Sequence, residues 1–168
     1  FLLNEFRMKF TQTNSKPSDR SIFRKNIGRA LLNKQRDFDY LRVWNIDYTI
    51  HINRTKYSRL RNIDKEKDIE SQITSYLGKK FYFRWIFYLG QEKRMGKAGM
   101  ESRLIGTVAN CNLCSSSKNW LGGYSSISKI NKGKLWLSQH LNSTGIIDSD
   151  KHYLLEEVTR AKDSYGSS

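Results

Sequence analysis

The sequence has few of the features that would place a chain in a membrane or outside a cell. No run of about eighteen apolar residues occurs in its 168 residues, and the apolar opening at 1–3 is broken at once by polar and charged residues. Only two cysteines are present, Cys111 and Cys114, too few and too close together for the disulfide framework of a secreted protein. We therefore expect a cytoplasmic chain without a membrane span.

Several catalytic patterns are also missing. The sequence has no Gly-rich phosphate loop, its three histidines are scattered, and no Ser, His and Asp spacing suggests a triad, which argues against nucleotide-driven chemistry and covalent hydrolysis. Cys111-x-x-Cys114 supplies only two of the four ligands of a structural zinc site. It also follows an expected helix, whereas a redox pair usually precedes one. Two ordinary small residues are therefore the favoured interpretation.

Acidic residues are scarce. Thirty Lys and Arg stand against sixteen Asp and Glu, and the resulting net charge of +14 repels itself unless a polyanion shares the surface. Residues 1–61 hold fourteen basic and five acidic side chains, so nine of the surplus charges lie in the first third. Because 38% of the residues are hydrophobic and 12% aromatic, the chain can still bury a core. These observations indicate a globular domain that binds nucleic acid.

The apolar spacing predicts helices, strands and one domain. Helices are expected over 2–12, from Ser18 or Asp19 to Leu31, over 62–76 with Gly78 closing it, over 100–110 and over 150–160. Strands are expected over 43–52 and 79–89. The aromatic second strand should be core, with a stacking platform for single-stranded nucleic acid as the alternative. Residues 111–143 should wrap over the core of a single domain at 1–163, and 164–168 should fray.

Two features of these helices could carry chemistry. Arg20, Arg24, Lys25 and Arg29 lie on or beside the second helix without interleaved acids, which favours contact with phosphates over a solvated face. Glu101 stands at the start of the helix over 100–110, where a carboxylate could hold Mg²⁺ against a DNA phosphate. The helix dipole also favours an acid there, by about 0.3–1 kcal/mol, so the position alone is more often structural.

Five blocks of sequence follow one another in a characteristic order. They are the basic helix at 21–32, Phe-x-Phe-x-Trp at 81–85, Met-Glu at 100–101, Ser-Lys-Asn-Trp-Leu-Gly at 117–122, and Lys-Gly-Lys-Leu-Trp at 132–136 with His140 after it. In this order they resemble one branch of the GIY-YIG nuclease superfamily, and the resemblance covers most of the chain.

The resemblance implies an α/β fold, with a small mixed or antiparallel sheet flanked by helices. The two strands that carry Gly-Ile-Tyr and Tyr-Ile-Gly would precede Phe1, so the domain is expected to be incomplete at its N-terminus. The sequence Tyr-Leu-Gly at 88–90 looks like the second motif, but it lies on a later expected strand and is not a substitute.

The resemblance also implies site residues. Glu101 would bind a single divalent ion and Asn110 would follow it in the site, while His140 would join the nucleic-acid contacts. Arg7 would neutralise the scissile phosphate, although a strict register could place Glu5 or Leu3 at its position.

The resulting hypothesis is an endonuclease that hydrolyses DNA phosphodiesters by water attack with one Mg²⁺ or Mn²⁺, and that cuts poorly or not at all without the upstream strands. A non-catalytic nucleic-acid-binding module is the alternative. A basic domain for acidic protein partners is a third possibility, and it does not share the steep loss of affinity with salt that phosphate binding shows.

Overall fold

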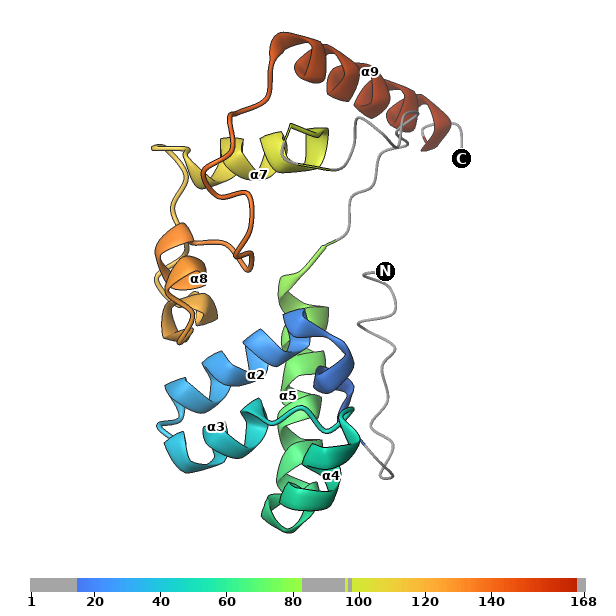
Figure 1. The fold of residues 1–168 in the computed structure, drawn as a ribbon. Coiled ribbons are helices and arrows are strands. Elements are labelled where there is room, and N and C mark those ends of the chain that lie inside the picture. The colour runs from blue at the N-terminus through green and yellow to red at the C-terminus, as the bar shows by residue number, and fades with distance from the viewer. Residues whose placement is uncertain (1–14, 83–95, 97, 166–168) are drawn as a thin grey trace. The chain divides into compact units, whose positions relative to one another are not determined.

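Helices are the regular structure of the part of the chain that the structure describes. The computed structural model describes residues 15–82, 96 and 98–165 (Figure 1). Within these residues every regular element is a helix, so the expected α/β fold with a sheet is wrong for the described part of the chain. No described helix is long and apolar enough to cross a membrane.

The chain forms two compact units. Unit 1 comprises Phe1–Phe83 and Ser117–Trp136, and unit 2 comprises Arg84–Ser116 and Leu137–Ser168. The described elements of unit 1 are η1 (Pro17–Arg20), α2 (Ile22–Lys34), α3 (Phe38–Asn45), α4 (His51–Tyr57), η2 (Ser58–Leu60), α5 (Ile63–Lys80), η3 (Leu121–Tyr124) and α8 (Ser128–Gly133), where η denotes a 3-10 helix. Those of unit 2 are α7 (Met100–Ala109) and α9 (Asp148–Tyr165).

Four of the expected helices are confirmed, namely α2, α5, α7 and α9. The expected start of α2 at Ser18 or Asp19 is wrong, because both residues belong to η1 and α2 begins at Ile22 after its N-cap Ser21. Two of the four helices start at a side-chain cap. The Ser21 hydroxyl accepts a hydrogen bond from the Arg24 amide (3.2 Å), and the Asn62 side chain accepts one from the Lys65 amide (3.0 Å). α5 continues through Gly78 to its end at Lys80, so this glycine does not close it. The helix expected over 2–12 lies outside the described residues.

The strand expected over 43–52 is wrong, because this segment contains the end of α3 and the start of α4. Asp37 caps α3 by accepting a hydrogen bond from the Tyr40 amide (3.2 Å). Tyr40 and Trp44, one helical turn apart, are both buried. Asp47 accepts hydrogen bonds from the amide and hydroxyl of Thr49 in the turn that follows. Burial of a helical stripe thus outweighed the β-propensity of the individual residues.

The strand expected over 79–89 is absent from residues 79–82, the part of this segment that the structure describes. Residues 79 and 80 belong to α5, and 83–89 lie outside the described residues. Phe81, which follows α5, packs edge-to-face on Phe23 at 5.4 Å between ring centroids and on Tyr76 at 5.9 Å. The start of the aromatic run is therefore part of the core of unit 1.

α2 is the central helix of unit 1, in contact with α3, α5 and η3 (Figure 1). Its core face carries Ile27, which is fully buried with Ile73 of α5. Gly28 lets Trp44 of α3 approach closely, because a Cβ at residue 28 would collide with the indole ring. Residues 117–136 of the expected wrap return to this core, where Leu121 is 4% exposed.

In unit 2, an irregular segment runs back along α7. The Thr107 hydroxyl accepts a hydrogen bond from the Ile146 amide (2.8 Å). Gly106 is buried against the backbone of Ser143, where a Cβ would collide with the carbonyl. The segment is thereby held on α7 before the chain enters α9.

Candidate functional site

Glu101 lies in the first turn of α7 with its side chain exposed. Gly99, the residue at the N-cap, has no side chain to satisfy the first amides of the helix. Within the described residues no cationic group lies within 4 Å of the Glu101 carboxylate. Among the described residues, therefore, no cation competes with a ligand for this carboxylate.

Asn110, expected beside Glu101, closes the other end of α7. Its side-chain amide donates hydrogen bonds to the carbonyls of Gly106 (2.8 Å) and Leu141 (3.2 Å). Asn110 lies nine positions after Glu101, which places the two residues about 13 Å apart along the axis and on opposite sides of the helix. α7 does not bring these two side chains together. Asn110 instead holds the segment that contains Leu141 on the helix.

Arg24, expected to contact phosphate, points into unit 1. Its guanidinium is fully buried and donates to Glu70 Oε2 from Nε (3.1 Å) and Nη2 (2.7 Å). The same Nη2 donates to the Thr74 hydroxyl (2.9 Å), while the Glu70 carboxylate also accepts the Ser18 amide (2.8 Å). The charge of Arg24 is thus satisfied by α5, and in this conformation no phosphate can reach it.

Lys25 is held in a similar way. Its ammonium lies 3.2 Å from Asp19 Oδ1 and donates to the Ile46 carbonyl at 3.3 Å. Lys16 binds the same two oxygens, at 2.8 and 3.2 Å, and its ammonium lies 4.7 Å from the ring centroid of Tyr48. Burial holds the pKa of Lys16 below its usual value, against the pull of Asp19. One carboxylate and one carbonyl thus fix both lysines.

The remaining expected contacts are dispersed. Arg20 is exposed at the end of η1. Arg29 is half-buried, and its Nη1 donates to Asn26 Oδ1 (2.7 Å) and its Nε to Asn45 Oδ1 (2.6 Å). His140 has a left-handed backbone (φ 61°) in the loop of unit 2 before α9. Arg7 lies outside the described residues.

Unit 2 contains a largely buried ion pair that the helical periodicity of the sequence does not predict. Arg103 of α7 donates to both carboxylate oxygens of Asp150, from Nε to Oδ2 at 2.5 Å and from Nη2 to Oδ1 at 2.6 Å. These hydrogen bonds hold the pKa of Asp150 below its usual value. Its Oδ2 also accepts the Ile147 amide (3.1 Å). Two features of the sequence could have indicated this pair, namely a lone Arg among the small and apolar residues of α7 and an acid at the start of α9.

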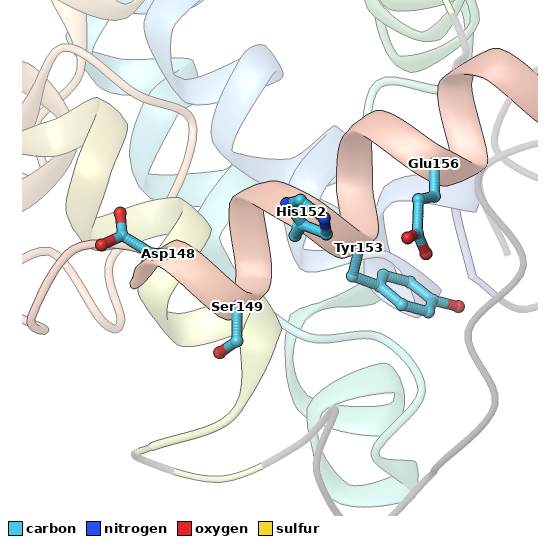
Figure 2. A pocket seen from close by; sticks show the side chains of 5 residues that line it. All are labelled: Asp148, Ser149, His152, Tyr153 and Glu156. Atoms are coloured by element: carbon cyan, nitrogen blue, oxygen red, sulfur yellow. The ribbon is translucent and has the colours of Figure 1, made fainter.

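A hollow of about 510 Å³ lies along the first turns of α9. The described residues that line it are Asp148, Ser149, His152, Tyr153 and Glu156. Figure 2 shows Asp148 at the beginning of the helix and Glu156 at the other end of the hollow. These two carboxylates are eight residues apart, about 12 Å along the axis, and Asp148 is paired with Lys151 (2.9 Å). They cannot share one ion.

The family resemblance implies one divalent metal ion, which can be tested against these side chains. In the described part of the chain, no three His, Cys, Asp or Glu side chains lie close enough to hold a metal. Mg²⁺ does not need such a cage, because one or two carboxylates with waters and substrate phosphates usually complete its shell. Glu101 fits this requirement. Asp150 does not, because Arg103 occupies both of its oxygens.

Comparison with known proteins adds a family. A model described as GIY-YIG domain matches residues 11–164, which covers most of the chain and extends over both units. No curated protein and no solved structure matches the chain. The match agrees with the order of sequence blocks from 21 to 140. The chain therefore belongs to the GIY-YIG domain family, whose members are in general nucleases.

Proposed function

We propose that this chain is an endonuclease that hydrolyses DNA phosphodiesters with one bound Mg²⁺ or Mn²⁺. Membership in a nuclease family supplies the reaction class. The observation that supports metal-dependent cleavage of DNA is the exposed Glu101 carboxylate at the start of α7, in a chain with a net charge of +14. A metal ion held there could be shared with a phosphate oxygen of the DNA.

Glu101 is the residue that would hold the ion. When bound, a divalent ion supplies charge for the phosphate in its transition state and lowers the pKa of a coordinated water. The uncapped amides of the first turn of α7 add the positive end of a helix dipole beside the same carboxylate. This arrangement favours a phosphate group next to Glu101.

Cationic side chains would supply the other contacts. Arg7 would neutralise the scissile phosphate, and the exposed Arg20 and the partly exposed Arg29 would bind flanking phosphates without reading sequence. His140 would contact the nucleic acid from unit 2. We do not assign phosphate contacts to Arg24 and Lys25, because the carboxylates of Glu70 and Asp19 already hold them.

Cleavage of supercoiled plasmid in Mg²⁺ tests the proposal. Glu101→Gln keeps the size of an exposed side chain and removes its charge, so it should lower the nicking rate at least a hundredfold with an unchanged unfolding temperature. The matched control is Asp64→Asn, an exposed first-turn acid of α5, which should nick at the wild-type rate.

Chelation of the metal by EDTA should abolish nicking by the wild-type chain. Full nicking by Glu101→Gln would remove Glu101 from the metal site. Because this chain is expected to nick poorly without the two motif strands, the discriminating result is that of the full-length protein. DNA binding without any metal-dependent nicking by the full-length protein would instead support a non-catalytic binding module.

A further inference from the structure

A long stretch of the chain contains no acid. Residues 102–147 include no Asp or Glu, while they hold one Arg and four Lys. The Arg is Arg103, which is committed to Asp150. The four lysines, Lys118, Lys129, Lys132 and Lys134, all belong to the segment that returns to unit 1, and all four are exposed.

A further cation from α2 reaches η3, the short helix that α8 also contacts. Lys34, in the last turn of α2, is exposed, and its ammonium lies 5.8 Å from the ring centroid of Tyr124. α2 and α8 both contact η3, the short helix that ends at Tyr124. We call the five lysines and Tyr124 the α8 lysine surface. In the described residues none of its lysines lies within 4 Å of a carboxylate oxygen.

The backbone beneath this surface is held from both sides. Asn33 of α2 donates its side-chain amide to the Tyr124 carbonyl (2.9 Å), and Asn131 of α8 donates to the Gly123 carbonyl (2.5 Å). Leu121 anchors the same turn in the core. Two asparagines therefore fix consecutive carbonyls between the lysines of two helices, so little backbone ordering has to accompany binding of a partner.

Tyr124 gives the surface a hydroxyl group. Its side chain is 47% exposed although it lies in a turn that is pinned to the core. An exposed tyrosine beside lysines can donate a hydrogen bond to a phosphate oxygen, which is a frequent contact to nucleic-acid backbones. A surface that combines five cations, no acid and a neutral donor is complementary to closely spaced phosphates.

We infer that the α8 lysine surface is a binding site for the phosphate backbone of duplex DNA. The inference rests on the proposed function, since it names where the substrate is held. It also places the main phosphate contacts of unit 1 on Lys34 and residues 117–136, whereas the charge pattern of the sequence favoured Arg20, Arg24, Lys25 and Arg29.

The test compares two triple variants of the full chain on one DNA duplex. Lys118→Gln/Lys129→Gln/Lys132→Gln removes three cations from the surface. Lys134 is left in place because its positive φ of 54° would complicate a substitution. The control, Lys56→Gln/Arg59→Gln/Lys67→Gln, removes three exposed cations from α4, η2 and α5. Both variants change the net charge by the same amount, so long-range attraction falls equally.

Affinity is measured by fluorescence anisotropy across a series of salt concentrations. The slope of log affinity against log salt is negative, and each lost phosphate contact makes it less steep by about 0.9. The slope of the surface variant should therefore be less steep than that of the wild-type chain by nearly three. Near physiological salt this corresponds to on the order of a hundredfold weaker binding. The control should keep the wild-type slope. Both variants should unfold at the wild-type temperature, because the replaced side chains are exposed.

Tyr124→Phe separates the hydroxyl contact from charge. It should weaken binding severalfold and leave the salt slope unchanged, because a neutral donor releases no counterion. A wild-type slope in the surface variant, or an equal loss in the control, would overturn the inference. If the surface variant lost more affinity for polyglutamate than for DNA, the inference would be overturned in favour of an acidic protein partner. Absence of both DNA binding and nicking in the wild-type chain would instead refute the proposed function.

Discussion

Replacing Arg24 by Met should destabilise unit 1 strongly and leave the intrinsic affinity of the folded chain for DNA unchanged. Met keeps most of the apolar stem and removes the guanidinium. The Glu70 carboxylate, whose side chain is 4% exposed, then loses its cation. Among the described residues, the Ser18 amide is the hydrogen-bond donor that remains to this carboxylate. A buried charge is left without compensation.

The expected loss of stability can be estimated from the burial of the Glu70 carboxylate without its cation. Removal of one partner from a buried ion pair costs about 3–5 kcal/mol. For a chain of this length 1 kcal/mol shifts the unfolding temperature by about 2–4 °C, so Arg24→Met should unfold roughly 6–20 °C below the wild-type chain. The exposed Arg20→Met should change the free energy of unfolding by less than about 0.5 kcal/mol.

A double variant makes the measurement sharper. Arg24→Met with Glu70→Leu removes both charges and should recover much of the lost stability, because two apolar side chains can fill the space of a buried pair. Thermal unfolding and urea titration of the three variants supply the cycle. An Arg24→Met chain with wild-type stability and reduced DNA affinity would show that Arg24 faces the substrate and would refute this reasoning.

Two further predictions concern the glycines of unit 1 and the acid response of unit 2. Gly28→Ala drives a Cβ into the Trp44 ring and should destabilise by about 1–3 kcal/mol, whereas Gly78→Ala, in open space on a helix, should stabilise by about 0.5–1 kcal/mol. Equal effects in urea titration would contradict this packing. Since Arg103 lowers the pKa of Asp150 below its usual 3.8, the carboxylate stabilises the fold above that value, and this contribution is lost as pH falls through the folded-state pKa. The stability deficit of Asp150→Asn should therefore be full at neutral pH and should shrink as the pH falls through the folded-state pKa, below 3.8. A deficit that is constant with pH would exclude the ion pair as its cause.

The helices that carry their own start signals could be predicted from the sequence. Asn62 stands directly before an amphipathic segment and caps α5 as such a residue does. The start of α2 was predicted at Ser18 or Asp19 but follows Ser21, because Pro17–Arg20 form a 3-10 helix of their own. The segment over 43–52 was misleading, because its β-branched and aromatic residues suit a strand locally. What decides the outcome is the burial of Trp44 against Gly28, a contact between helices that no local pattern contains.

The residues of the candidate site also differ in how far the local sequence predicts them. Glu101 could be located because a helix boundary is a local property. Whether Arg24 reaches solvent depends on Glu70, which is 46 residues further along the chain and reads by itself as an ordinary helix-surface acid. A cluster of cations in a sequence therefore identifies an excess of charge, but it does not identify the face on which that charge is displayed.

The order in which the two units use the chain has a consequence for biosynthesis. Unit 1 is not complete when residue 83 leaves the ribosome, because Leu121 and Trp136 of its core are made only after α7 of unit 2. At about 5–20 residues per second this is a delay of roughly 3–11 seconds, during which the apolar side of α2 and α5 is uncovered. A single cut between residues 83 and 117 should therefore yield two pieces that fail to fold separately, and co-expression should be needed to recover the protein.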